Sequence, residues 1–510
     1  MTSDTFGNAA MVSVRATRAS ARLWWTPSFT SLAFIVPVLL LYWRLAGPSA
    51  LLDDPNTGVH VRTGEWILKH HAIPRQDLFS FTLAGHPWCD WEWLSDAVYA
   101  LLHRWGALAA IAAFSLALLC LTSLIVYRTA RFRVGPTIAF AVTCLVMATT
   151  TIHWLARPHL FTWLFVAIVC WMIQRARATG RNKVLFLLPL LMVLWVNLHP
   201  GFLAAFLLVG IWCLGEAMQS RVTSIREQGA DHRKWAVWFG VVGVACLAAT
   251  FANPYHIQLH RHIASYLFSP TTVTTQVEEW LSPDFHNPRL HWFELLLPVG
   301  AAAGIWHGLR KRIVWCLLVL VGMHLALVSV RNVPIFAIVC VTPIASFVDH
   351  VMRQSRFVIR LRSAEQSLTF ARSRLGTSMC YGIAAALLIV VFCSRSLGLG
   401  PQSSLPVEAA AHLPAGRLFT TDRWADYLIY REPQHGVFLD CRNDFYGPDF
   451  VKDYLAVITV EPGWQDVLTK YALTVVLVPR HSPISAALAV SADWSLSYQD
   501  AVAAVFQRVK

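Results

Sequence analysis

The sequence predicts a mainly helical protein, a polytopic membrane bundle of about eleven spanning helices followed by a small α/β domain outside the membrane. Three observations lead to this fold class. Of the 510 residues, 56% are hydrophobic and only 14% are charged, whereas soluble proteins carry about 25% charged residues. Apolar runs recur at close to the ~20 residues that a spanning helix needs. After residue 394 the chain changes character, beginning with a Gly-, Ser- and Pro-rich segment.

The membrane domain is expected to cover residues 29–393, after a cytoplasmic N-terminal segment at 1–28. The apolar runs place its spans at residues 29–46, 106–127, 134–152, 159–174, 184–198, 200–217, 235–252, 291–309, 313–330, 333–350 and 377–393. Two long polar loops, 47–105 and 253–290, then lie on the same outer side of the membrane. We expect the chemistry of the protein in these loops.

The net charge of +13 follows from the distribution of Lys and Arg. They gather between alternate spans, as in Arg310, Lys311 and Arg312. Positive charges near helix ends resist translocation, so these segments are expected to face the cytoplasm. The N-terminus is then inside and everything after 394 is outside. The first span lacks a small-residue cleavage site, which indicates an uncleaved anchor. Because topology accounts for the charge, we expect no nucleic-acid binding.

The last part of the chain has the pattern of a separate domain. Residues 394–406 are the linker "SRSLGLGPQSSLP". In 407–510, short apolar stretches such as "LTVVLVP" alternate with helical candidates such as "WADYLIY", which indicates an extracytoplasmic α/β domain. Cys89 and Cys441 are the clear cysteines outside the apolar runs. A disulfide between them stays open for an oxidising compartment.

The first outer loop begins with two adjacent carboxylates, Asp53 and Asp54. Since Asp54 precedes Pro55, it is suited to cap a helix over 55–69. A carboxylate at the outer end of the first span is also suited to take a proton from an acceptor hydroxyl beside a lipid headgroup. The two interpretations are compatible. His60, one helical turn after Asn56, is expected to share a helix face with it.

Further along this loop, "GHPWCDWEWLSD" places three tryptophans among Asp90 and Glu92. Trp is enriched at membrane interfaces, and the acids are suited to cap the next span. Aromatic faces beneath a sugar ring, with carboxylates on its hydroxyls, are the functional alternative. Both interpretations stay open at this point.

Polar residues also stand at three outer turns between spans. They are Arg157 and His159, then His199, then Arg331 and Asn332. Charges at membrane depth are costly, so an Arg kept there usually has an anionic partner. A phosphate group suits the guanidinium, which binds it through two hydrogen bonds and keeps its charge. The alternative is an Arg that extends to ordinary lipid headgroups.

The second long loop, 253–290, adds Glu279 as a candidate second acid/base group or metal ligand. Its histidines, His256, His260 and His262, invite comparison with a zinc site. No carboxylate or Cys stands at ligand spacing from them within the segment. An amphipathic helix explains these histidines equally well.

Taken together, several segments resemble a group of bacterial multi-pass membrane proteins related to the C-type glycosyltransferases, a superfamily that includes the protein O-mannosyltransferases. The resemblance spans most of the chain. It rests on "DDPNTGVHVRTGEW", "GHPWCDWEWLSD", "ARPHLFTWLF", "WVNLHPGF", "NPY", "EWLSPDFHNP", "VRNVP" and "GRLFTTDRWADYLIY". It implies a location in the cell's inner membrane. It further implies a polyprenyl-phosphate-linked sugar as donor, membrane lipids as surroundings, and an unknown glycan, lipid or protein as acceptor.

The resemblance also implies roles for individual residues. The superfamily's essential acid lies in the first outer loop, where Asp54 occupies the matching position with Asp53 beside it. An inverting displacement would then use Asp54 as the base. Arg157 and Arg331 would stabilise the leaving phosphate.

Two further points follow from the resemblance. Glu92 or Glu279 would orient the acceptor. Asn56 departs from the group's Asp-Pro-Asp-Thr pattern, which weakens a paired-carboxylate site for Mg²⁺ or Mn²⁺. A divalent cation is therefore an open expectation, and no residue is predicted as a metal ligand.

Three other functions compete with this one. A transporter or flippase favours polar sites near mid-membrane, whereas the polar groups here gather at one face. A polysaccharide polymerase or ligase shares the donor class and differs in transferring a preassembled glycan. A non-catalytic assembly protein would keep the fold without the activity, and the Asn56 departure leaves this alternative open.

Overall fold

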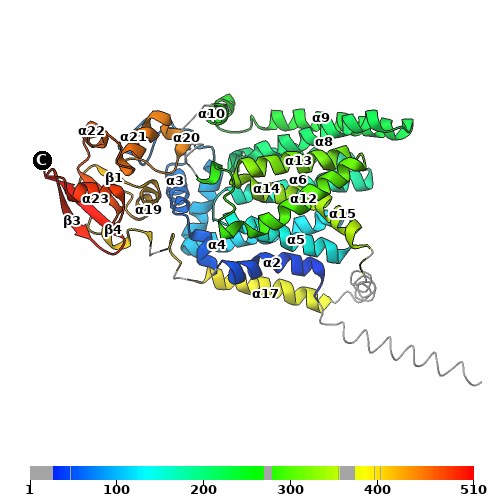
Figure 1. Cartoon of the computed structure of the whole chain (residues 1–510), viewed down its shortest axis with the longest axis horizontal. Helices are drawn as coiled ribbons and strands as arrows, with labels where there is room; N and C mark the ends of the chain where they lie inside the picture. The colour runs from blue at the N-terminus through cyan, green and yellow to red at the C-terminus, as the bar shows by residue number, and fades with distance from the viewer. Residues whose placement is uncertain are drawn as a thin grey trace, which may run out of the picture.

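The computed structural model describes residues 27–45, 47–268, 278–353, 355, 374–394, 397–401 and 404–509. Figure 1 shows a bundle of roughly parallel helices with a small domain of helices and strands at one end. The apolar character of these helices makes the chain an integral membrane protein. The mainly helical fold class, with a small sheet, is confirmed.

Each predicted span coincides with helix. The helices of the bundle are α2 (Phe29–Arg44), α4 (Trp93–Ala130), α5 (Pro136–Thr150), α6 (His159–Thr179), α7 (Leu188–Leu198), α8 (Leu203–Val222), α9 (Arg226–Ala249), α12 (His291–Leu309), α13 (Ile313–Val328), α14 (Val333–Val339), α15 (Val341–Met352) and α17 (Arg374–Phe392). Between α14 and α15 the axis bends by 60°. Pro343 explains the bend, because it has no N–H to donate to Val339 one turn earlier.

Not all of these helices are long enough to cross a membrane by themselves. Within the described residues, four pass on length and apolar composition: Trp93–Ala130, Pro136–His153, His159–Thr179 and Pro200–Val222. The bent pair α14 and α15 makes a fifth, and four apolar helices are shorter. The number of about eleven spans, and the orientation in the membrane, therefore stay predictions.

The end of the bundle next to the C-terminal domain, which the sequence predicts to be the outer end, is built from short elements. These are η1 (Pro48–Leu52), α3 (Asn56–His70), η2 (Thr151–His153), η4 (Pro200–Phe202), α10 (Ile257–Phe268), η5 (Glu278–Trp280), η6 (Pro288–Leu290) and η7 (Val330–Asn332); η3 (Asn182–Leu187) leads into α7. Helix α3 packs on the first turns of α4, and the contact requires Gly64. A Cβ at this position would lie 1.9 Å from the carbonyl oxygen of Asp96.

The C-terminal domain holds a four-stranded sheet in the order β1-β2-β4-β3. Strand β1 (Leu418–Thr420) is parallel to β2 (Val475–Pro479), whereas β4 (Ala503–Arg508) is antiparallel to both β2 and β3 (Trp494–Gln499). The helices of this domain are α18 (Val407–Ala410), α19 (Asp422–Arg431), α20 (Asn443–Tyr446), α21 (Pro448–Ile458), α22 (Trp464–Lys470) and α23 (Pro483–Ala489). Its core includes Phe419, Phe438 and Phe506, all buried.

Helix α3 lies between the bundle and this domain, beside α19 (Figure 1). Nε of Arg62 in α3 donates to the carbonyl oxygen of Tyr430 in α19 at 2.9 Å. A Cβ on Gly58 would lie 2.5 Å from Cβ of Tyr430, so the two helices approach closely. The domain therefore rests directly on the segment that begins with Asp53 and Asp54.

Candidate functional site

Asp54 stands where η1 ends and α3 begins, and both of its carboxylate oxygens are engaged. Oδ1 accepts from the backbone N–H of Asn56 at 3.0 Å. This bond holds the first turn of α3, which begins at Asn56, one residue later than the sequence predicts. Oδ2 accepts from Nη1 of Arg157 at 3.0 Å. Asp54 thus joins the start of α3 to the turn before α6.

Arg157 binds a second carboxylate with the same nitrogen. Nη1 also donates to Oε1 of Glu279, in η5, at 2.9 Å. Burial opposes the charge on Arg157, but the carboxylates of Glu279 and Asp54 raise its pKa above the ordinary value. Burial likewise opposes the charge on Glu279, yet Arg157 and His153 lower the pKa of this carboxyl to about 2. Both groups are therefore charged at neutral pH.

The guanidinium of Arg157 has N–H groups that make no hydrogen bond with any described residue. Across the described part of the chain, its Nε and Nη2 have no hydrogen-bond partner. Cζ of Arg331, in η7, lies 5.2 Å from the ring centroid of Trp280. No carboxylate of a described residue lies within ion-pair distance of Arg331. Two arginines with free N–H groups thus flank Glu279 and Trp280.

Two other residues predicted for this region play local roles. Nδ2 of Asn332 donates to the carbonyl oxygen of Leu325 at 3.2 Å and so ties η7 to the end of α13. Nε2 of His159 lies 3.0 Å from the carbonyl oxygen of His153. Nε2 of His153 itself lies 3.7 Å from Oε1 of Glu279.

A second polar group, next to the first, contains Glu92 and two histidines. Nε2 of His60 lies 3.8 Å from Oε2 of Glu92, and Nδ1 of the same ring lies 2.7 Å from Oδ1 of Asp96. Nε2 of His199 lies 3.4 Å from Oε1 of Glu92. Burial lowers the pKa of His60 to about 4. Burial also raises the pKa of Glu92, although His60, Arg157 and Arg331 oppose this rise.

The proton on His199 can be placed from its hydrogen bonds. Nδ1 accepts from the backbone N–H of Gly201 at 2.9 Å and lies 2.9 Å from Oγ1 of Thr162. In the neutral ring the proton is then on Nε2. His199 therefore presents an N–H to Glu92, the carboxylate that the sequence suggests for orienting an acceptor.

Asp53 and Asp90 lie at the edges of these two groups, and the carboxyl group of Asp90 faces Asp96 of the second group. The carbonyl oxygen of Asp53 accepts from Nη2 of Arg423 at 2.7 Å. Burial raises the pKa of its half-buried side chain, while Arg289 and Arg423 oppose this. Asp90 is buried, its backbone N–H donates to the hydroxyl of Tyr255 at 3.0 Å, and burial raises its pKa. Neither carboxyl group contacts Arg157.

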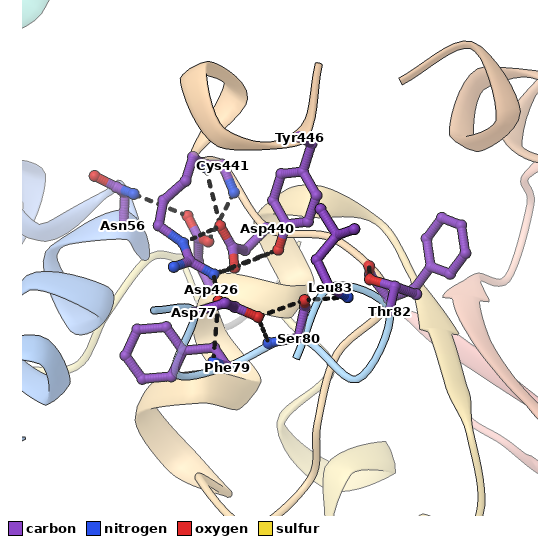
Figure 2. A network of polar contacts seen from close by, with 12 residues as sticks. Asn56, Asp77, Phe79, Ser80, Thr82, Leu83, Asp426, Asp440, Cys441 and Tyr446 are labelled. Carbon is purple, nitrogen blue, oxygen red and sulfur yellow. Dashed lines mark hydrogen bonds and ion pairs between the residues drawn. The ribbon is translucent and has the colours of Figure 1, made fainter. Parts of the chain in front are cut away.

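A buried polar network joins the first outer loop to the C-terminal domain (Figure 2). Nε and Nη2 of Arg442 donate to the two oxygens of Asp440 at 2.8 and 2.6 Å. The same Nη2 donates to Oδ1 of Asp77 at 2.6 Å. The hydroxyl of Tyr446 donates to Asp440 at 2.8 Å. The sequence does not reveal this network, because Asp77 stands 365 residues from Arg442, although Asp440 and Tyr446 are close to Arg442 in the chain.

Asn56 belongs to the domain contact. Its Nδ2 donates to Oδ2 of Asp426, in α19, at 3.3 Å, and both side chains are buried. The backbone N–H of Cys441 donates to Oδ1 of the same carboxyl at 3.1 Å. The side chain of Asn56 thus points toward α19.

Cys441 and Cys89, which the sequence suggests as a possible pair, are both free thiols. The disulfide considered from the sequence is absent between these two described residues.

The three tryptophans of the first outer loop do not form one surface. Trp88 is buried, with its ring centroid 4.6 Å from Cζ of Arg442. Nε1 of Trp93 donates to Oδ1 of Asn197 at 2.9 Å. Trp91 alone faces α10, with its ring centroid 5.7 Å from that of Tyr266. A single sugar platform made of all three is therefore wrong, because two of them are occupied with structural contacts.

A divalent cation does not fit the residues nearest Asp54. Within the described ranges, no group of three or more His, Cys, Asp or Glu is arranged to hold a metal ion. Each oxygen of Asp54 already accepts one hydrogen bond, and Asn56 offers an amide that contacts Asp426 where a second carboxylate would be needed. We derive no chemical step that uses a metal.

No protein-family model matches the sequence, and no curated protein matches it. Among solved structures, the chain is similar to the apo oligosaccharyltransferase of Archaeoglobus fulgidus, with a TM-score of 0.58 and 11% identity over 88% of this chain and 69% of that one. The same enzyme, AglB, in complex with an inhibitory peptide and a dolichol-phosphate, aligns with a TM-score of 0.55 and 10% identity over 88% and 69%. Its form tethered to an acceptor peptide gives 0.54 and 11% over 88% and 68%. This chain therefore shares the fold of an archaeal oligosaccharyltransferase.

Proposed function

We propose that this protein is an integral membrane glycosyltransferase of the cell's inner membrane. It moves a sugar from a polyprenyl-phosphate carrier to an acceptor on the extracytoplasmic side. The shared fold supports the class of enzyme, since a similar solved structure holds a dolichol-phosphate, which is also a lipid-linked phosphate. The acceptor can be a glycan, a lipid or a protein, and the bacterial source follows only from the resemblance of the sequence.

The observation that carries this proposal is the arrangement around Arg157. One nitrogen of its guanidinium binds Asp54 and Glu279, while Nε and Nη2 are free to bind two phosphate oxygens. Arg331 adds a second cation without a carboxylate partner among the described residues. A base and a phosphate-binding edge thus stand side by side at the outer end of the bundle.

The proposed reaction is a single displacement. The acceptor oxygen forms a bond to the anomeric carbon as the bond from that carbon to the phosphate oxygen breaks, and the electron pair stays on the phosphate. Asp54 takes the proton of the acceptor. Arg157 and Arg331 stabilise the charge that develops on the leaving phosphate. Glu92, whose carboxylate lies 3.8 Å from Nε2 of His60 and 3.4 Å from Nε2 of His199, would bind an acceptor hydroxyl.

This arrangement bears on the competing functions. A polysaccharide polymerase or ligase would use the same phosphate-binding edge and differ only in the size of the transferred glycan. A transport protein does not need a base such as Asp54 beside the arginine that would bind the phosphate of the donor. A non-catalytic protein would have no need to leave N–H groups of Arg157 free beside Asp54 and Glu279.

Native mass spectrometry of the gently extracted protein tests the proposal. The wild type is compared with Arg157→Ala and Arg331→Ala. Arg261→Ala, an exposed arginine on α10, is the matched control. We expect a polyprenyl-phosphate sugar on the wild type and the control, and its loss from both site variants. Identical ordinary phospholipid on all four proteins would contradict the proposal.

A further inference from the structure

Arginines also gather at the end of the bundle that the proposed reaction does not use. Arg310 and Arg312 lie in the turn between α12 and α13, and Arg133 lies just before α5. Nη2 of Arg310 is 3.4 Å from Nε2 of His350 in α15. Figure 1 shows α15 at the end of the bundle far from the C-terminal sheet. The sequence predicts that this end faces the cytoplasm.

Two tryptophans lie directly beneath these arginines. Cζ of Arg310 and Cζ of Arg312 are 4.6 and 5.1 Å from the ring centroid of Trp306. Cζ of Arg133 is 5.6 Å from the ring centroid of Trp315. Such contacts hold guanidinium groups against an aromatic face and leave their N–H groups free.

The two tryptophans belong to one continuous cluster. The buried ring of His307 lies between them, with centroid distances of 4.6 Å to Trp306 and 5.9 Å to Trp315. Nε2 of His307 is 3.1 Å from the carbonyl oxygen of Pro343, which fixes the ring against α15. The ends of α12, α13 and α15 therefore present the three arginines on a single rigid support.

No acidic partner balances these arginines within the part of the chain that the structure describes. Nearby Arg177, in contrast, lies 3.2 Å from Oε1 of Glu216. Burial, Arg177 and Arg312 together lower the pKa of Arg133, and burial and Arg310 lower the pKa of Arg312. The positive charges thus repel one another in this structure, and a bound anion would remove that repulsion.

We infer that Arg133, Arg310 and Arg312, together with Trp306 and Trp315, form a binding site for the phosphate headgroup of an anionic membrane lipid. Guanidinium groups bind phosphate through paired hydrogen bonds. Tryptophan favours the level of the lipid headgroups. Basic pockets between spanning helices on the cytoplasmic side recognise anionic headgroups. The site lies apart from Asp54 and Arg157, so the inference does not depend on the proposed reaction.

Thermal unfolding of the full chain in detergent tests the site. Phosphatidylglycerol, phosphatidylcholine and inorganic phosphate are titrated separately at equal ionic strength. The test variant is Arg133→Gln with Arg312→Gln, and the control is Arg175→Gln, a single arginine whose Cζ lies 5.2 Å from the ring of Trp171. Phosphatidylglycerol is expected to raise the unfolding temperature of the wild type and the control, whereas the double variant binds it about thirtyfold more weakly.

Three results would overturn the inference: an unchanged response of the double variant, an equal effect of phosphatidylcholine, or full stabilisation by inorganic phosphate alone. Should the double variant not fold, the single variants replace it, each with an affinity about fivefold lower. Native mass spectrometry of the wild type provides an independent measurement. Retention of phosphatidylglycerol in preference to phosphatidylcholine supports the site, and equal retention argues against it.

Discussion

Arg157 and Arg442 each bind two carboxylates, and they differ in how far their side chains are exposed. Arg157 holds Asp54 and Glu279 at the outer end of the bundle, with side chains that are 23%, 20% and 26% exposed. One nitrogen makes both contacts, so most of the guanidinium is available to a further partner. The side chains of this group are thus partly accessible to a further partner.

Arg442 holds Asp77 and Asp440 where the first outer loop meets the C-terminal domain. Its side chain is 8% exposed, and those of both acids are 0% exposed. The oxygens of Asp440 accept hydrogen bonds from Nε and Nη2 of Arg442 and from the hydroxyl of Tyr446. Nη1 of Arg442 is buried and has no partner among the described residues. The same residue types are thus partly open to solvent in one place and buried in the other, and it is side-chain exposure that separates the two.

The largest effect is expected from Arg442→Ala. Removing this guanidinium leaves two buried carboxylates unpaired, which lowers the free energy of unfolding by about 3–5 kcal/mol. Denaturant unfolding in detergent, followed by tryptophan fluorescence, measures this loss. Arg431→Ala, an exposed arginine on α19, serves as the control. Equal stability of the two variants would show that the network is not what holds the domain to the bundle.

Arg157→Ala is expected to change the stability of the protein little and its transfer activity strongly. Its partly exposed pairs contribute only about 0–1 kcal/mol to folding. Transfer activity is expected to fall about 10²–10³-fold, because the leaving phosphate loses its main hydrogen-bond donor. A transfer assay on reconstituted protein, run beside the unfolding curve, separates the two readouts. If Arg157→Ala lost stability and kept its activity, Arg157 would be a structural residue like Arg442.

Glu279→Gln addresses the pH dependence. Pairing with Arg157 lowers the pKa of Glu279 from 4.5 to about 2 in the folded protein. Its contribution to stability is therefore complete above about pH 4.5 and lost as the pH falls toward 2. Unfolding temperatures of the wild type and Glu279→Gln, measured from pH 6 to 2.5, should differ most at pH 6 and converge in acid. Parallel curves would mean that the pair contributes nothing.

The smallest effect is expected from Asn332→Ala. This amide binds only the carbonyl oxygen of Leu325 among the described residues. Its loss should cost about 0.5–1.5 kcal/mol of stability and leave retention of the donor lipid unchanged. Native mass spectrometry beside Arg331→Ala tests this difference between neighbours. Loss of the lipid from Asn332→Ala would place the amide in the donor site.

The helices were predictable because apolar runs of spanning length need no partner to be recognised. The cap on α3 was predictable for a similar reason, since Asp54 and Pro55 are adjacent. The pairing of Asp54 with Arg157 was not, because 103 residues separate them. The sequence indicates Asp54 by its place after the first span and by the resemblance, and Arg157 by its place at an outer turn, without linking the two. Asp426 carried no signal at all, since its partner Asn56 is 370 residues away.

The contact between α3 and α19 also explains in physical terms why residue 56 is Asn where the resembling group has Asp. Burial and Asp440 already raise the pKa of Asp426, so a carboxylate at residue 56 would add a further negative charge to a site that disfavours charge. An amide instead donates to Asp426 and keeps α19 on α3. The departure is therefore compatible with an intact Asp54, whose contacts with α3 and Arg157 are all present.

The central claim is that Asp54 is the base of a transfer reaction, and one assay tests it most directly. The protein is reconstituted with the sugar-bearing lipid that it retains, acceptor-containing cell extract is added, and release of free polyprenyl phosphate is followed by mass spectrometry. We predict that Asp54→Asn, which is nearly isosteric, still binds the donor but releases phosphate about 10²–10⁴-fold more slowly than the wild type. Release at the wild-type rate would contradict the account.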